Sequence, residues 1–176
     1  MSGKFGDQVV FRTRNGKSIP ANIPVASGKA PAESQVRIRD NFKLAAIWAK
    51  RILEDPGMRA AYEAKATNGR TPYVVALTDF LKPPRIVSVD TAGYEGHPGN
   101  EIIITAFDGF MVKEVQVKIE DAAGELIEKG KCEPDPVGMF WLYRTVKEIS
   151  GLAGVTITVI AIDNPGHATE ETVRVS

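Results

Sequence analysis

Two adjacent prolines, Pro83 and Pro84, divide the chain into parts with different hydrophobic periodicity. Proline fixes φ and disfavours helix in the residue before it, so the pair ends a helix and marks a boundary. After it, apolar and polar residues alternate in seven short runs, which is typical of half-buried strands. These runs are RIVSVD, NEIIITAFD, VKEVQVKIED, GELIEKGKCE, MFWLYRTVK, GVTITVIAID and ETVRVS. Strands of this number and spacing predict an immunoglobulin-like β-sandwich over residues 85–176.

The predicted sandwich must be held together by apolar side chains. The sequence has a single cysteine, Cys132, so no internal disulfide can form. We expect this cysteine to be a small buried side chain rather than a nucleophile. Alternation within the runs puts the expected core at Ile103, Val115, Val117, Trp141, Val155, Ile157 and Val159.

Residues 33–82 carry helical periodicity instead. A first helix is expected over residues 33–54, with a buried face made of Val36, Leu44, Ile47, Trp48 and Ile52. Asp55-Pro56 and Thr71-Pro72 each place proline directly after an N-cap residue, which predicts two further helices. Three short helices fit either a small bundle or a DNA-reading helix-turn-helix. The bundle is favoured, because the basic residues scatter instead of lining one helix.

The stretch RTRNGKSI near the N-terminus has two interpretations. Its letters Gly-Lys-Ser end a phosphate-binding loop, but that loop needs glycine where this chain has Phe11. Asn15-Gly16 is the strongest short-range signal for a β-hairpin. A two-residue loop would pair Arg14 with Lys17, Thr13 with Ser18 and Arg12 with Ile19. We therefore predict a hairpin and a proline-rich arm over residues 1–32.

The predicted hairpin is also a candidate subunit interface. An isolated two-stranded hairpin is marginal in water, so its apolar residues must pack on something else. Like charges directly opposite each other cost about 0.2–1 kcal/mol, which favours an acidic partner. The alternative is a solvated basic edge that discourages aggregation. The candidate interface residues are Val9, Phe11, Arg12, Arg14, Lys17 and Ile19.

The net charge of zero conceals two oppositely charged halves. Residues 1–83 hold 14 Lys and Arg against 7 Asp and Glu, and residues 84–176 hold 8 against 15. A basic half can bind nucleic acid, or it can meet the acidic half of another copy. We expect the second of these. No membrane partner is expected, because no run approaches the roughly 18 apolar residues of a membrane helix.

Together these features predict a structural subunit that assembles with copies of itself, as in virions, injection apparatuses or extracellular filaments. Its hairpin would extend a sheet in a neighbour by β-augmentation. The alternative is a monomeric immunoglobulin-like module that binds a glycan or a protein. Its expected contacts are Tyr94 and Phe110, the latter at an Asp108-Gly109 turn and expected to be exposed.

Catalytic, cofactor and metal sites are not expected. The chain has no Gly-x-Ser-x-Gly, no His-Glu-x-x-His and no cysteine with a nearby histidine. His97 and His167 fall in the first and last inter-strand loops, at opposite ends of a sandwich, too far apart to share a metal. Without the apolar segment of a Sec signal, we expect a cytoplasmic protein, or part of a released particle or extracellular assembly.

Several N-terminal motifs resemble an uncharacterised family from Bacteroidota. Gly3-Lys4-x-Gly6, Val9-Val10 and Asn15-Gly16-Lys17 match its hairpin, and Ser34, Gln35, Arg39 and Phe42 match its first helix. The resemblance covers roughly residues 2–80. It departs at Pro20-Ala21-Asn22, where similar sequences often carry Arg or Lys. The C-terminal part is similar to bacterial immunoglobulin-like modules. These resemblances imply an α+β architecture of hairpin arm, helical bundle and sandwich, with no established catalytic role.

Overall fold

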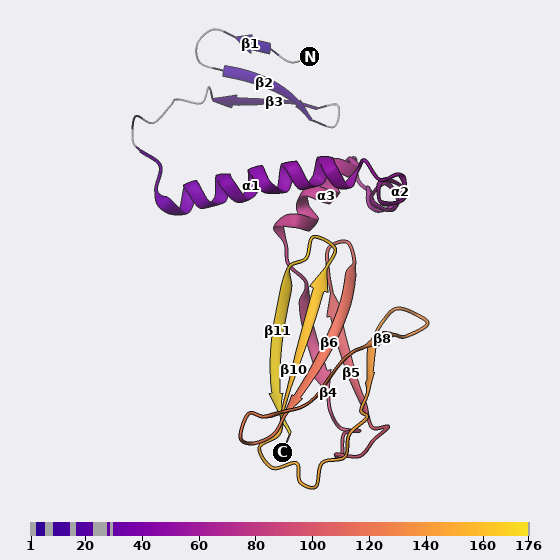
Figure 1. Cartoon of the computed structure of the whole chain (residues 1–176). Helices are drawn as coiled ribbons and strands as arrows, with labels where there is room; N and C mark the ends of the chain where they lie inside the picture. Colours follow the sequence, from indigo (N-terminus) through magenta and orange to yellow (C-terminus); the bar gives the residue numbers. More distant parts are fainter. Residues whose placement is uncertain (1–2, 6–8, 15–16, 23–27, 29, 176) are drawn as a thin grey trace.

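The computed structural model describes residues 3–5, 9–14, 17–22, 28 and 30–175 (Figure 1). Within this part the chain is mixed α and β, as predicted, with three helices and three antiparallel sheets. A small N-terminal sheet comes first, then the helices, then two larger sheets. The first elements are β1 (Gly3–Phe5), β2 (Val9–Arg14), β3 (Lys17–Asn22), α1 (Glu33–Ile52), α2 (Pro56–Lys65) and α3 (Pro72–Leu81). The remaining strands are β4 (Arg85–Asp90), β5 (Glu101–Phe107), β6 (Val112–Glu120), β7 (Leu126–Lys131), β8 (Glu133–Pro134), β9 (Trp141–Arg144), β10 (Thr156–Asp163) and β11 (Ala168–Arg174).

The N-terminal sheet has the strand order β1-β2-β3. Its β2–β3 register pairs Arg14 with Lys17 and Arg12 with Ile19, which confirms the predicted hairpin pairing. Two features were not predicted: β1 adds a third strand, and β3 continues through Pro20 to Asn22. The Asn15-Gly16 turn, residues 23–27 of the predicted arm, and the side chains of Arg12 and Arg14 lie outside the described residues.

The second and third helices begin where the sequence predicts. Asp55 Oδ1 accepts a hydrogen bond from the Met58 N–H at 2.8 Å, and Thr71 Oγ1 accepts one from the Val74 N–H at 3.3 Å. Each cap satisfies a backbone donor that the first helical turn leaves unpaired. Proline follows each cap, in a position where its missing N–H costs nothing.

The buried face of α1 differs from the prediction. Val36, Leu44 and Ile47 are exposed, whereas Ala45 and Ala49 are completely buried. The distance between packed helices depends on the side chains at the contact, and alanines allow α3 to approach closely. Small residues therefore mark the packed face of this helix, and several of its larger apolar residues remain uncovered.

The two C-terminal sheets form one domain, residues 85–175, which we call the two-sheet domain. Their strand orders are β11-β10-β6-β7 and β4-β5-β9-β8. Every predicted run contains a strand, and the two-residue β8 is additional. The inner faces of both sheets contribute to a single apolar core, which includes Ile102, Ile104, Val115, Val117, Ile119, Val155, Ile157 and Val159.

Most of the expected core positions of this domain are confirmed. Trp141 packs at the margin of the core, and Cys132 is buried within it. Ile103 was expected in the core but is 38% exposed, because the alternation along β5 turns Ile102 and Ile104 inward instead. Ile103 therefore lies on the outer face of the sheet.

The neighbouring isoleucines of β5 provide a matched test of this core. Ile104→Ala removes a fully buried side chain and should lower the free energy of unfolding by about 2–5 kcal/mol. Ile103→Ala, on the outer face, should cost less than about 1 kcal/mol. Urea denaturation followed by circular dichroism measures both. Equal losses for the two variants would contradict the assigned strand orientation.

Candidate interaction surface and domain junction

The helices and the two-sheet domain are joined by an inserted aromatic ring. Phe110, from the turn between β5 and β6, packs in the helical core and stacks on Tyr62 of α2, with ring centroids 3.8 Å apart and planes at 19°. Asp108 Oδ2 shapes this turn by accepting hydrogen bonds from the N–H groups of Phe110 (2.9 Å) and Met111 (3.0 Å). The turn thus delivers one apolar side chain into a different domain.

A buried polar network surrounds this stack. The Tyr62 hydroxyl donates to Asp79 Oδ2 of α3 at 2.6 Å and accepts from Asn164 Nδ2 at 3.1 Å. Asn164 lies in the β10–β11 turn. The network therefore links α2 and α3 to the two-sheet domain. Burial first, and then the hydrogen bond to Asp79, raise the pKa of Tyr62. Its hydroxyl therefore stays protonated as a donor.

The β10–β11 turn is itself held by a carboxylate. Asp163 Oδ1 accepts from the N–H groups of Gly166 (2.7 Å) and His167 (2.6 Å), and Asp163 Oδ2 lies 2.9 Å from His167 Nδ1. The His167 ring then packs edge-on against Phe80 of α3, with centroids 5.0 Å apart. His167 therefore helps to hold the two-sheet domain against α3.

Two carboxyl groups meet inside the junction. Asp79 Oδ1 and Asp108 Oδ1 are both buried, and neither receives a donor among the described residues. Asp79 interacts directly with Asp108, so a proton held between them would satisfy both oxygens. Burial raises the pKa of Asp79 to about 7; the Tyr62 hydrogen bond opposes this, and Asp108 reinforces it. Asp79 accordingly acts as a neutral hydrogen-bond donor below that pH.

Both aromatic residues predicted to contact a ligand are buried. Phe110 is 8% exposed, so its expected exposure is wrong, and Tyr94, at 4%, is not open to a ligand either. An Asp-Gly turn normally points outward, but here the helical bundle covers it. Tyr94 instead belongs to the core of the two-sheet domain. Burial raises the pKa of its hydroxyl, with a smaller contribution from Glu128.

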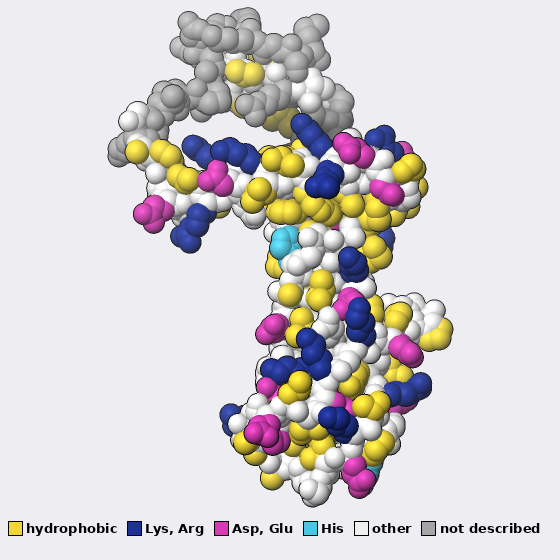
Figure 2. All heavy atoms as spheres, in the orientation of Figure 1, with side chains coloured by type: hydrophobic (Ala, Val, Ile, Leu, Met, Phe, Trp, Pro, Cys, Tyr) yellow, Lys and Arg dark blue, Asp and Glu magenta, His cyan; other side chains and the backbone are white. Residues whose placement is uncertain are grey.

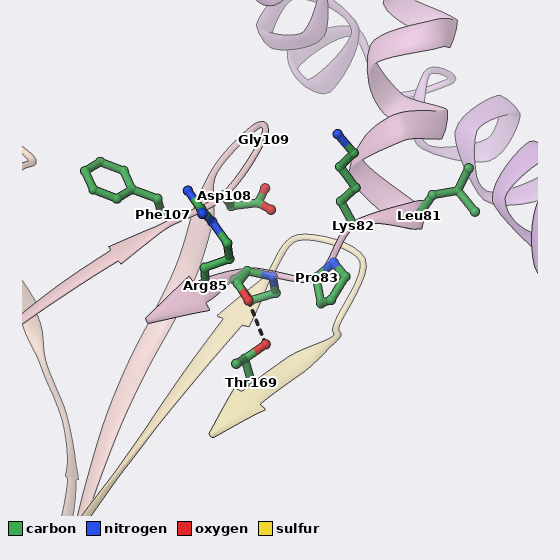
Figure 3. A pocket seen from close by; sticks show the side chains of 9 residues that line it. Leu81, Lys82, Pro83, Arg85, Phe107, Asp108, Gly109 and Thr169 are labelled. Atoms are coloured by element: carbon green, nitrogen blue, oxygen red, sulfur yellow. Dashed lines mark hydrogen bonds between the residues drawn. The ribbon is translucent and has the colours of Figure 1, made fainter. Parts of the chain in front are cut away.

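A hollow of about 720 Å³ lies beside the junction, between the end of α3, the linker and the two-sheet domain (Figure 3). Lys82 and Arg85 flank it, together with Phe107 and Asp108. The Thr169 hydroxyl at its wall already donates to the Pro84 carbonyl at 2.7 Å. The hollow thus lies where the linker joins the two bodies, and its lining includes two cations and one carboxyl group.

The described residues contain no cluster of three or more His, Cys, Asp and Glu that could hold a metal. His97 lies in the β4–β5 loop and His167 in the β10–β11 turn, at opposite ends of the two-sheet domain (Figure 1). Burial raises the pKa of the Cys132 thiol to about 12, which makes it a poor nucleophile. Among the described helices, none is long and apolar enough to cross a membrane.

The most prominent uncovered apolar surface belongs to α1. Every residue from Glu33 to Leu44 is exposed, because α2 and α3 pack only on the C-terminal half of this helix. Figure 2 shows hydrophobic and basic side chains together along α1. Its large apolar side chains are between 41% and 69% exposed, and they are Val36, Ile38, Phe42, Leu44 and Ile47.

The candidate interface residues of the hairpin lie on the N-terminal sheet, which Figure 1 places beyond α1 from the two-sheet domain. Phe11, Lys17 and Ile19 are exposed and Val9 is half-buried. The strands of this sheet pack mainly on one another. The exposed apolar residues of the hairpin and those of α1 thus lie on separate elements.

Comparisons with known proteins identify no family. No protein-family profile matches the chain, and no curated protein sequence matches it. One crystal structure, of an engineered protein, is similar over 60% of this chain and 27% of that chain, at 12% identity and a TM-score of 0.34. The match therefore covers about a quarter of the engineered protein.

Deprotonation of Asp79 should weaken the junction. Its pKa is raised from 3.8 to about 7 on folding, so the folded state binds this proton more tightly. The stability it contributes is present at low pH and is lost as pH rises through about 7. We expect a melting temperature a few degrees lower at about pH 8 than at about pH 5.

Asp79→Asn replaces the acid proton with an amide N–H. This variant should match the wild type near pH 5 and melt at a higher temperature near pH 8. The control, Asp90→Asn, changes an exposed aspartate and should keep the wild-type pH dependence. Parallel melting curves for wild type and Asp79→Asn across this range would contradict the shared proton.

Proposed function

We propose that this protein is a structural subunit that assembles with copies of itself, as in a virion, an injection apparatus or an extracellular filament. The supporting observation is the N-terminal half of α1, which carries large apolar side chains and is covered by no other described element. Large apolar side chains exposed on one short segment, here on two faces of the helix, are typical of interaction sites.

The N-terminal arm supplies the second contact in this proposal. Strands β1 and β3 are the edges of its sheet, so either could add to a neighbouring sheet. Pro20 lies within β3 and has no N–H to donate, as is common in protected edge strands. Apolar contacts by Val9, Phe11 and Ile19 therefore carry most of the affinity, rather than an uninterrupted ladder of hydrogen bonds.

The opposed charges of the two halves add direction to the assembly. The basic half of one copy meets the acidic half of the next, so unlike surfaces are in contact. Each exposed pair contributes only about 0–1 kcal/mol and is screened by salt. Charge complementarity thus sets orientation and association rate more than affinity.

The two-sheet domain is, in this proposal, an immunoglobulin-like sandwich. Its orders β4-β5-β9-β8 and β11-β10-β6-β7 correspond to the A-B-E-D and G-F-C-C′ sheets of that fold. Such a domain gives the subunit a stable body on which the helices and the arm are mounted. The alternative function, a monomeric binding module, loses support because both of its expected contacts, Tyr94 and Phe110, are buried.

A charge placed on the arm tests the proposal. Ile19→Asp should shift the wild-type assembly toward single chains without changing the melting temperature, because Ile19 is exposed on β3. Light scattering after size exclusion measures the mass, and negative-stain images show the particle shape. Leu126→Asp, an equally large apolar-to-acid change on exposed β7, is the matched control and should assemble normally.

Loss of assembly in both variants would indicate a general solubility effect rather than an interface at the arm. A wild-type protein that remains a single chain at every concentration would contradict self-assembly itself.

A further inference from the structure

One exposed apolar face of α1 continues the face by which the same helix packs in the bundle. Ile38, Phe42, Ala45 and Ala49 follow one another at spacings of four, three and four residues, which places them on one side of the helix. The two alanines are completely buried in the bundle, whereas Ile38 and Phe42 are 69% and 51% exposed. The same face is therefore buried at one end of α1 and open at the other.

Two cations flank this open end. Arg37 and Arg39 are exposed, and neither forms an ion pair with any other described residue. By contrast, Lys43 on the same helix pairs with Asp40 at 2.9 Å. A partner surface for Ile38 and Phe42 should therefore combine apolar side chains with carboxylates.

The outer face of the β4-β5-β9-β8 sheet has this combination. On β5, Ile103 and Phe107 are exposed, and Ile103 lies opposite Leu142 of β9. Carboxylates lie next to this apolar pair: Asp90 of β4 opposite Ile103, and Glu133 of β8 opposite Leu142. We call this the outer β5 face.

The carboxylates of the outer β5 face are available. Both Asp90 and Glu133 are exposed, and within the described part of the chain neither forms an ion pair. Glu101, on the same sheet, is instead engaged by Arg144 at 3.1 Å. Asp90 and Glu133 are thus exposed acidic groups that could pair with the exposed arginines of α1.

The β8–β9 loop, which is fixed by hydrogen bonds, extends the apolar part of this face. Asp135 Oδ1 accepts from the N–H groups of Met139 (2.6 Å) and Phe140 (2.9 Å), and Asp135 Oδ2 accepts from Val137 N–H (3.2 Å). These bonds fix the β8–β9 loop while the side chains of Val137, Met139 and Phe140 remain exposed. The loop projects from the sheet beside β8 (Figure 1).

We infer that the open end of α1 in one copy docks on the outer β5 face of a second copy, with Ile38 and Phe42 over Ile103 and the arginines beside Asp90 and Glu133. This inference rests on the proposed self-assembly and names its receiving surface. Among the described residues α1 packs chiefly on α3, and Ile38, Phe42 and Ile103 are exposed. Because they differ, the contact is head-to-tail and generates a ring or a filament.

Charge reversal tests the pairing in the full-length chain. Arg37→Glu with Arg39→Glu, and separately Asp90→Lys with Glu133→Lys, should each weaken assembly by about tenfold in concentration. An equimolar mixture of the two variants should restore assembly, since each acidic α1 then meets a basic face and each basic α1 an acidic face. Restoration would support the pairing, and a mixture as weak as its components would overturn it.

Cysteine cross-linking places the two surfaces together independently of charge. Phe42→Cys and Ile103→Cys chains, mixed and treated with a mild oxidant, should give a disulfide-linked heterodimer; the native Cys132 is buried and does not compete. Phe42→Cys mixed with Lys129→Cys, on exposed β7 of the other sheet, is the control and should not cross-link. Equal cross-linking of both mixtures would overturn the inference.

These outcomes separate the inference from the function on which it rests. Wild-type assembly that is unaffected by either charge reversal, with no specific cross-link, contradicts only the α1 contact. A wild-type chain that never assembles contradicts both proposals.

Discussion

The insertion of Phe110 into the helical core is the contact on which the rest of the arrangement depends. The chain itself connects the helices to the two-sheet domain only through a short linker at Pro83-Pro84. Phe110 adds an apolar anchor from the β5–β6 turn, and Asn164 adds a hydrogen bond from the β10–β11 turn. Two turns and the linker thus hold the bundle at one end of the two-sheet domain. With the bundle fixed there, the first three turns of α1 extend beyond the described helices that pack on it.

The polar groups of the junction favour one arrangement over others. Tyr62, Asp79 and Asn164 satisfy one another only when α2, α3 and the β10–β11 turn are all in place. A buried network of this kind is costly when partly satisfied, so it selects the complete geometry. Burial raises the pKa of Asp79 to about 7, so that selection depends on pH. An otherwise apolar contact between domains thereby acquires a defined orientation, which a repeating assembly requires of each subunit.

Local sequence signals predicted the elements of the fold well. Asp55-Pro56 and Thr71-Pro72 begin helices because a cap and a proline act within one turn, independently of the rest of the chain. Period-two alternation located the seven main strands for the same reason. Very short strands were not predicted, because β1 and β8 contain three and two residues, too few to establish a period.

Interactions between distant segments could not be predicted in this way. Phe110 follows an Asp-Gly turn, which locally indicates exposure, and only the bundle packed over it reverses that outcome. The hydrogen bond between Asn164 and Tyr62 joins residues 102 positions apart. One sequence signal could have indicated the polar network of the junction. Asp79 is the only acidic residue in the apolar helix PYVVALTDFL. A lone carboxyl group on such a helix needs a hydrogen-bond partner when it is buried. On α1, apolar residues occur on several faces, so the sequence did not distinguish the packed face from the open one.

We propose that the exposed apolar surfaces of α1, the arm and the outer β5 face join copies of the chain. Sedimentation velocity of the full-length protein, over a wide range of concentration and at low and high salt, tests it most directly. We expect species heavier than one chain, whose share rises with protein concentration and falls at high salt, where the arginines and carboxylates are screened. A single species with the mass of one chain under all these conditions would contradict it.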